Sequence, residues 1–236
     1  MGANRRSDNI SAMPISHSRL TRGLVALTLI ATGCLPYSVA STADPTPPGE
    51  TQPTAVWFAI PNGVSAFGDS SETAIVGADA EVRFGLDDYS DIGVRLTSAS
   101  GIVANYKRRL DAPSGTNRAA VALMGGVGIV NLGSHAHFEL TLLGSAPQRM
   151  LTPYGGLRAM QVAPLNRGAV HDEPSLGGFL GLRIGRKNMA VSPEVAVYYD
   201  RSALGIRDRN IIVVPAIAVH GEELIRLIGT ILGAIR

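Results

Sequence analysis

The sequence feature that most constrains the fold is an alternation of apolar and polar residues with a period of two. In the segment 78–86 every even position holds Ala, Val, Phe or Leu, and the odd positions hold Asp, Glu, Arg and Gly. Successive side chains of a β-strand point to opposite faces of the sheet, so this pattern predicts a strand with one apolar and one polar face. The same rhythm recurs along the chain in the segments 54–60, 75–86, 92–98, 102–110, 118–129, 135–143, 152–162, 177–186, 189–199 and 211–220.

The number and spacing of these segments favour a closed barrel. No stretch with a helical period interrupts them before residue 221, and their even number is the one that a bacterial single-chain membrane barrel requires. The connectors 61–74, 163–176 and 200–210 fall on one side, and the short connectors 87–91 and 187–188 fall on the other, with both ends of the barrel. We therefore expect an all-β, antiparallel up-and-down membrane barrel of about ten strands, with eight or twelve as alternatives.

The polar faces of the predicted strands carry charges of both signs, as the interior of a small membrane barrel does. We predict a charge network in the lumen built from Asp79, Glu81, Arg83, Arg95, Lys107, Arg118, His135, His137, Glu139, Arg158, Arg183 and Glu194. The alternative is a soluble barrel that turns these charges to solvent and encloses an apolar ligand. The position of the apolar faces distinguishes the two arrangements: an outward belt indicates the membrane barrel, and a central core indicates the soluble barrel. The apolar residues concerned are Ala80, Val82, Phe84, Val121, Leu123, Phe138 and Leu140.

The amino terminus is typical of an export signal. Arg19 and Arg22 precede an apolar run at 23–31, which is shorter than the roughly 20 residues that a spanning helix needs. We predict a signal peptide over 1–33, with Met1 or Met13 as the true start. Two cleavage sites remain open. One is a lipobox, Ala31-Thr32-Gly33-Cys34, which predicts lipidation of Cys34, and the other is ordinary cleavage after Ser38-Val39-Ala40. The single Cys of the chain directly follows Gly33, which favours the lipobox.

Three further segments complete the predicted domain organisation. The segment 34–53 is rich in proline and small polar residues, and we interpret it as an extended tether between a lipid anchor and the barrel. The barrel spans 54–220. In the segment 221–236, apolar residues at 224, 228, 231 and 235 recur at helical spacing, which predicts a short amphipathic helix.

The chain resembles a group of poorly characterised bacterial outer-membrane β-barrel lipoproteins. The resemblance lies in Cys34, in Pro47-Pro48-Gly49-Glu50, and in the stretch 83–96. In this group a strand that ends in aromatic-Gly-Leu turns through an acidic stretch into Asp-hydrophobic-Gly-hydrophobic-Arg. The resemblance implies a signal peptide, residence in the outer membrane and no established catalytic role.

Composition and motifs narrow the function. Without residues 1–33 the chain holds 17 basic and 18 acidic residues, which argues against a nucleic-acid partner. A single Cys excludes a disulfide framework and a multi-Cys metal site. Ser70 lies in a Gly-Asp-Ser sequence but lacks a matching Asp-x-x-His, so we expect no enzyme. His135, His137 and Glu139 on one strand face are expected to form hydrogen bonds rather than a metal site, and the His171-Asp172-Glu173 loop is expected to be a solvated charge cluster.

These observations predict a barrel lipoprotein of the outer membrane with a structural or interaction role at the cell envelope. Barrels of about ten strands are narrow, so we expect a narrow or plugged lumen rather than a general porin. The expected partners are outer-membrane lipid, lipopolysaccharide and the barrel-assembly machinery, and no cofactor is expected. The alternative function is a periplasm-facing soluble barrel lipoprotein that binds an apolar ligand.

Overall fold

A computed structural model describes residues 35–63, 73–98, 100–111, 119–146, 148, 150–166, 173–186, 189–199, 211–223, 226 and 230. These residues form ten strands: β1 (Thr51–Gly63), β2 (Thr73–Asp87), β3 (Ser90–Thr97), β4 (Gly101–Arg109), β5 (Ala120–Val130), β6 (His135–Ser145), β7 (Leu151–Pro164), β8 (Ser175–Arg186), β9 (Met189–Tyr199) and β10 (Ile211–His220). Among the described residues no helix is long and apolar enough to cross a membrane. The predicted helix at 221–236 lies largely outside the described residues and stays a prediction.

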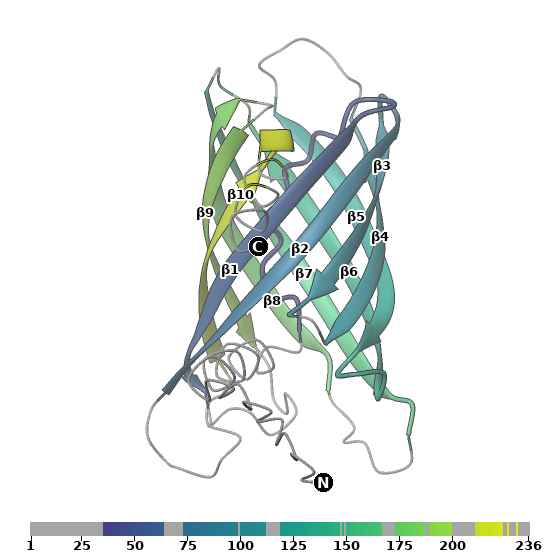
Figure 1. Cartoon of the computed structure of the whole chain (residues 1–236), viewed down its shortest axis with the longest axis vertical. Helices are drawn as coiled ribbons and strands as arrows, with labels where there is room; N and C mark the ends of the chain where they lie inside the picture. Colours follow the sequence, from purple (N-terminus) through teal and green to yellow (C-terminus); the bar gives the residue numbers. More distant parts are fainter. Residues whose placement is uncertain are drawn as a thin grey trace, which may run out of the picture.

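The ten strands close into one antiparallel barrel in which each strand pairs with its neighbours in sequence. Closure comes from β1 and β10, which pair in the register Thr54 with His220 and Phe58 with Ala216. Figure 1 shows the result as a tall cylinder of steeply tilted strands. The predicted all-β up-and-down barrel is confirmed. Each strand pairs with a neighbour on both sides, so closure of the barrel leaves no strand edge unpaired.

The barrel has two mouths, which we name by the chain segments that meet there. The terminal mouth, uppermost in Figure 1, is where β1 begins at Thr51 and β10 ends at His220. The loop mouth is the opposite end, where β1 leads towards β2 and β9 towards β10. The predicted connectors 61–74, 163–176 and 200–210 all belong to the loop mouth, although most of their residues lie outside the described part of the chain.

The outward faces of the strands are apolar, whereas the inward faces carry the buried charges together with apolar side chains such as Met124 and Leu143. Phe84, Phe138 and Leu140 are 43%, 47% and 53% exposed, whereas Glu81 and Arg95 are 3% and 1% exposed. Ala80, Val121 and Leu123 are also exposed, and Val82 is half-buried. A soluble barrel would not leave its outer face apolar, whereas a lipid-facing surface requires such a face.

Large rings fill part of the interior by lying across glycines of the neighbouring strand. Phe58 pairs with Gly77, Tyr198 with Gly177, and Tyr154 with Gly181. A Cβ at any of these three glycines would lie 2.2 or 2.3 Å from a ring carbon. The glycines therefore leave room for the rings inside a narrow barrel, which explains why glycine occupies these inward positions.

Candidate functional site

The first group of interior charges lies on β2, β3 and β4. Register places Glu81 opposite Arg95 and Asp91 opposite Lys107. The Arg95 guanidinium lies 2.8 Å from the Glu81 carboxylate, and the Lys107 ammonium lies 3.3 Å from the Asp91 carboxylate. Arg83 joins the two pairs, since it contacts Glu81 at 2.7 Å and Asp91 at 2.5 Å. Each buried charge in this group thus faces at least one opposite charge, which offsets the cost of its removal from water.

Glycine makes this charge group compact. Gly93 lies between Arg95 and Asp91 on the inward face of β3, and a Cβ there would lie 2.6 Å from Glu81 Oε1 and 2.7 Å from Asn105 Oδ1. Asn105 in turn donates from Nδ2 to Glu81 at 3.0 Å and accepts from Arg83 at 2.7 Å. The absence of a side chain at position 93 is therefore what lets these polar groups meet.

A second charge group lies across the lumen on β6 and β7. His137 Nε2 lies 3.0 Å from Glu139 Oε2, and Arg158 donates to the same carboxylate oxygen. All three side chains are buried. Among the described residues, no three His, Cys, Asp or Glu side chains converge as metal ligands do.

The amino-terminal segment Leu35–Thr46, which we call the inner segment, runs inside the barrel. Leu35, Tyr37, Val39 and Ala43 are 4% exposed or less, and they pack in one cluster with interior residues of the strands. The Tyr37 ring meets the edges of Phe58 and Tyr198 in the half of the lumen nearer the loop mouth. Within the predicted tether over 34–53, the residues of the inner segment therefore lie inside the barrel. An extended, proline-containing chain exposes its main-chain polar groups, and the charged lumen binds them.

Glu194 on β9 binds two successive main-chain N–H groups of the inner segment. Val39 N–H donates to Glu194 Oε1 and Ala40 N–H donates to Oε2, both at 2.8 Å. The Ser38 hydroxyl donates to the same carboxylate at 2.9 Å, and the Tyr154 hydroxyl donates at 3.0 Å. Four donors thus compensate a carboxylate that is 3% exposed.

Two arginines, Arg95 on β3 and Arg158 on β7, bind main-chain carbonyl groups of the inner segment. Arg95 donates to Ser38 O at 2.8 Å and to Val39 O at 3.1 Å. Arg158 donates to Pro36 O at 2.6 Å and to Ser38 O at 3.2 Å. Each guanidinium therefore joins the inner segment to one of the two charge groups.

The inner segment leaves the lumen at the terminal mouth, held by further polar groups. Lys107 donates to Thr42 O at 2.9 Å and to Asp44 O at 3.0 Å, and Thr46 N–H donates to Asp91 at 2.7 Å. Beyond it, Gly49 adopts a φ of 75°, and its N–H donates to Gly85 O at 3.1 Å. This turn directs the chain into β1, which begins within the predicted tether at Thr51 rather than at 54.

Arg109 lies at the terminal mouth, where β4 ends beside the inner segment. Its guanidinium contacts Asp44 and Asp111, each at 2.7 Å. The hydrogen bond from Arg109 holds the pKa of the Asp111 carboxyl below its usual range. This pair is partly exposed and marks the limit of the buried charges at the terminal mouth.

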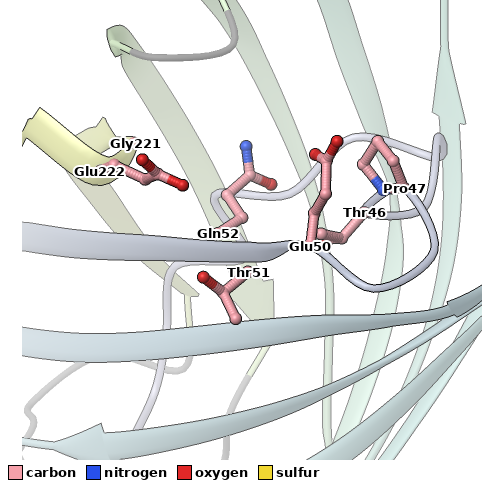
Figure 2. A pocket seen from close by; sticks show the side chains of 7 residues that line it. All are labelled: Thr46, Pro47, Glu50, Thr51, Gln52, Gly221 and Glu222. Carbon is pink, nitrogen blue, oxygen red and sulfur yellow. The ribbon is translucent and has the colours of Figure 1, made fainter.

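A small pocket lies where the inner segment turns into β1. It has a volume of about 230 Å³ and is lined by Thr46, Pro47, Glu50, Thr51, Gln52, Gly221 and Glu222. Figure 2 shows the Glu50 and Glu222 carboxylates on its lining, one beside the turn and one just after β10.

Most of the predicted charge network is inside the barrel, but it is not one network. Three further predicted residues are buried but belong to neither charge group: Asp79, His135 and Glu194. Asp79 accepts a hydrogen bond from Ser98 N–H, and Glu194 binds the inner segment. His135 lies beside Ser134 near the loop mouth. Arg183 is half-buried near the terminal mouth, where it faces the Gln52 amide. Arg118, predicted in the strand 118–129, lies outside the described residues, as do Cys34, Ser70, His171 and Asp172.

Sequence reasoning missed Asp91 and the inner segment. The sequence assigns Asp91 to the acidic connector at 87–91, but in the structure Asp91 is buried and points inward on β3, as Gly93 and Arg95 do. The inner segment has a short alternation of its own, with Leu35, Tyr37 and Val39 at odd positions. That alternation was the one local signal that these residues are ordered.

The chain is similar in structure to several solved outer-membrane proteins. The chain matches no protein-family model and no curated protein. An outer-membrane channel from Pseudomonas putida F1 is 10% identical with a TM-score of 0.47, and the match covers 78% of this chain and 99% of that one. Neisserial surface protein A is 13% identical with a TM-score of 0.35, over 73% of this chain and 96% of that one. The outer-membrane protein OprG from Pseudomonas aeruginosa is 12% identical with a TM-score of 0.32, over 76% and 95%.

Proposed function

We propose that the chain is an outer-membrane β-barrel lipoprotein whose lumen is closed by its own inner segment, and that it has a structural or interaction role at the cell envelope. The observation that carries this proposal is the position of the inner segment. Residues 36–46 contact interior side chains on β1, β3, β4, β6, β7 and β9, so the segment is held from every side of the lumen.

The outward apolar surface supports the membrane placement. Large apolar side chains on all ten strands are exposed, among them Trp57, Val94, Leu157, Leu180 and Ile217. A soluble protein rarely exposes an apolar surface that surrounds it completely, whereas a lipid bilayer covers one. In this placement the loop mouth faces the cell exterior, and lipid, lipopolysaccharide and the assembly machinery are the partners.

The hydrogen bonds of the inner segment also support one of the two cleavage sites. Cleavage after Ala40 would remove Ser38, Val39 and their bonds to Glu194, Arg95 and Arg158, and would leave these buried charges without those partners. Cleavage before Cys34 keeps every one of these contacts. We therefore propose cleavage before Cys34. Acylation of that residue is proposed from the lipobox sequence, and globomycin sensitivity of processing is the direct test of both.

Conductance in a planar bilayer tests the closed lumen. We expect the mature chain to form a heat-modifiable barrel that conducts little or no current. Steady conductance by the intact, heat-modifiable chain would contradict the proposal. Fractionation to the inner membrane or to the soluble fraction would contradict the placement.

A further inference from the structure

The lumen recognises the inner segment mainly through its main chain. Among the described residues, at least eleven hydrogen bonds join strand side chains to main-chain N–H or C=O groups of residues 36–46, and at least three involve side chains of this segment. The residues at the centre of the segment, 38–43, are Ser, Val, Ala, Ser, Thr and Ala. Main-chain hydrogen bonds give affinity without demanding one sequence, as in other modes of extended-peptide recognition.

The signs of the interior charges match a peptide and not a singly charged ligand. A carboxylate, Glu194, faces two N–H groups, while two guanidinium groups, Arg95 and Arg158, face the carbonyl groups beside them. An anion on this path would meet Glu194, and a cation would meet both arginines. A main chain presents donors and acceptors in turn, so it satisfies both signs at once.

The attachment of the inner segment to the barrel is exposed. Pro47, Pro48 and Gly49 are exposed at the terminal mouth, whereas Thr46 is 4% exposed. The covalent link between the segment and β1 therefore lies outside the binding site. The lumen contacts that hold the segment do not depend on that link.

We propose that the lumen is an exchangeable binding site for an extended polypeptide segment of small residues, which the chain's own inner segment occupies in cis. This inference rests on the proposed function, in which the inner segment closes the barrel. It goes further by naming the ligand class, an extended peptide, and the groups that bind it, Glu194, Arg95 and Arg158.

The test uses the full mature chain with Cys34→Ser, which carries no acyl chains, folded with its inner segment in place. A protease site inserted between Pro48 and Gly49 is cut after folding, so that the inner segment becomes a peptide held without a covalent link. Fluorescently labelled peptide of the sequence 35–48 is then added, and its uptake is followed by anisotropy while conductance is recorded. We expect saturable uptake of the peptide, opening of the lumen when the original segment is washed out, and closure when the peptide is returned.

Two modified peptides separate main-chain recognition from non-specific adsorption. N-methylation at Val39 removes the N–H that donates to Glu194, and we expect at least about tenfold weaker binding, which corresponds to about 1.4 kcal/mol. A peptide in which Ser41, Thr42 and Ala43 are reordered keeps Val39, Ala40 and every N–H and C=O, and we expect it to bind within about threefold of the original. Equal binding of the N-methylated peptide would overturn the proposal.

A pair of barrel variants completes the design. Glu194→Gln replaces one acceptor oxygen by a donor and is expected to weaken uptake about tenfold or more, while Glu223→Gln at an exposed site after β10 leaves uptake unchanged. A cut barrel that never releases its segment, or that opens but takes up no peptide, overturns the exchangeable site. An uncut chain that already conducts overturns instead the closed lumen of the proposed function.

Discussion

Single residues in the inner segment hold conformations that their contacts require. Ala40 has a φ of 48°, in the left-handed region that residues other than glycine seldom adopt. Its N–H donates to Glu194 at 2.8 Å, and this bond orients the peptide group in the unusual conformation. The strain at Ala40 is therefore a local cost that the binding of its main chain offsets.

Ala40→Gly relieves this strain, because glycine adopts a positive φ without a Cβ penalty. We expect the variant to raise the free energy of unfolding by about 0.5–1 kcal/mol, net of the greater freedom of glycine in the unfolded chain. Urea unfolding of the refolded barrel measures the change. Ala43→Gly is the matched control, since Ala43 is fully buried without a positive φ, and it should be neutral or destabilising. A loss of stability in Ala40→Gly would contradict the account of position 40.

At the scale of the strands, the register of β2, β3 and β4 determines which charges meet. The Glu81–Arg95 and Asp91–Lys107 pairs are direct cross-strand partners, and Arg83 bridges them because Gly93 lies opposite it on β3. A register shift between Gly85 and Asp87 ends the regular pairing just before the turn into β3. The charge group is thus a property of three paired strands and not of any one of them.

Gly93→Ala tests this packing. The added Cβ would lie within 2.6–2.9 Å of Glu81, Asn105 and Arg83, so the polar groups must separate. We expect a loss of roughly 1–3 kcal/mol in the free energy of unfolding, the usual cost of overpacking, seen as a lower temperature for the heat-modifiability shift. Gly125→Ala is the control, because its Cβ would meet only a main-chain oxygen of Glu139 at 4.0 Å. Equal stability of the two variants would show that the lumen is looser than the contacts indicate.

At the scale of the whole molecule, the barrel separates an apolar outer surface from an interior that holds buried charges, aromatic rings and the inner segment. The single Trp of the chain, Trp57, is 43% exposed on the outer face of β1. Its neighbours in sequence, Val56 and Phe58, point inward and are buried. The fluorescence of Trp57 therefore shows whether the outer face of β1 contacts lipid or water.

The fluorescence of Trp57 tests the membrane placement directly. In lipid vesicles we expect a blue-shifted emission that brominated acyl chains quench and aqueous acrylamide does not, because the outer face contacts acyl chains. Trp57→Phe provides the background signal and preserves an apolar ring at the position. Strong acrylamide quenching in vesicles, with no effect of the brominated lipid, would place this face in water.

What the sequence by itself determined is local in origin. Side chains of a strand alternate between its faces whatever the strand pairs with, so the strands, their antiparallel order and the shared face of Glu81, Arg83 and Arg95 could be predicted residue by residue. What only the tertiary structure decided depends on contacts between distant parts of the chain. Glu194 binds Val39 and Ala40 across more than 150 residues, and Arg158 binds Pro36 across 122. The partners of the inner segment lie on other strands, and only closure of the barrel brings their side chains around it. No periodicity within the segment itself can therefore reveal those partners.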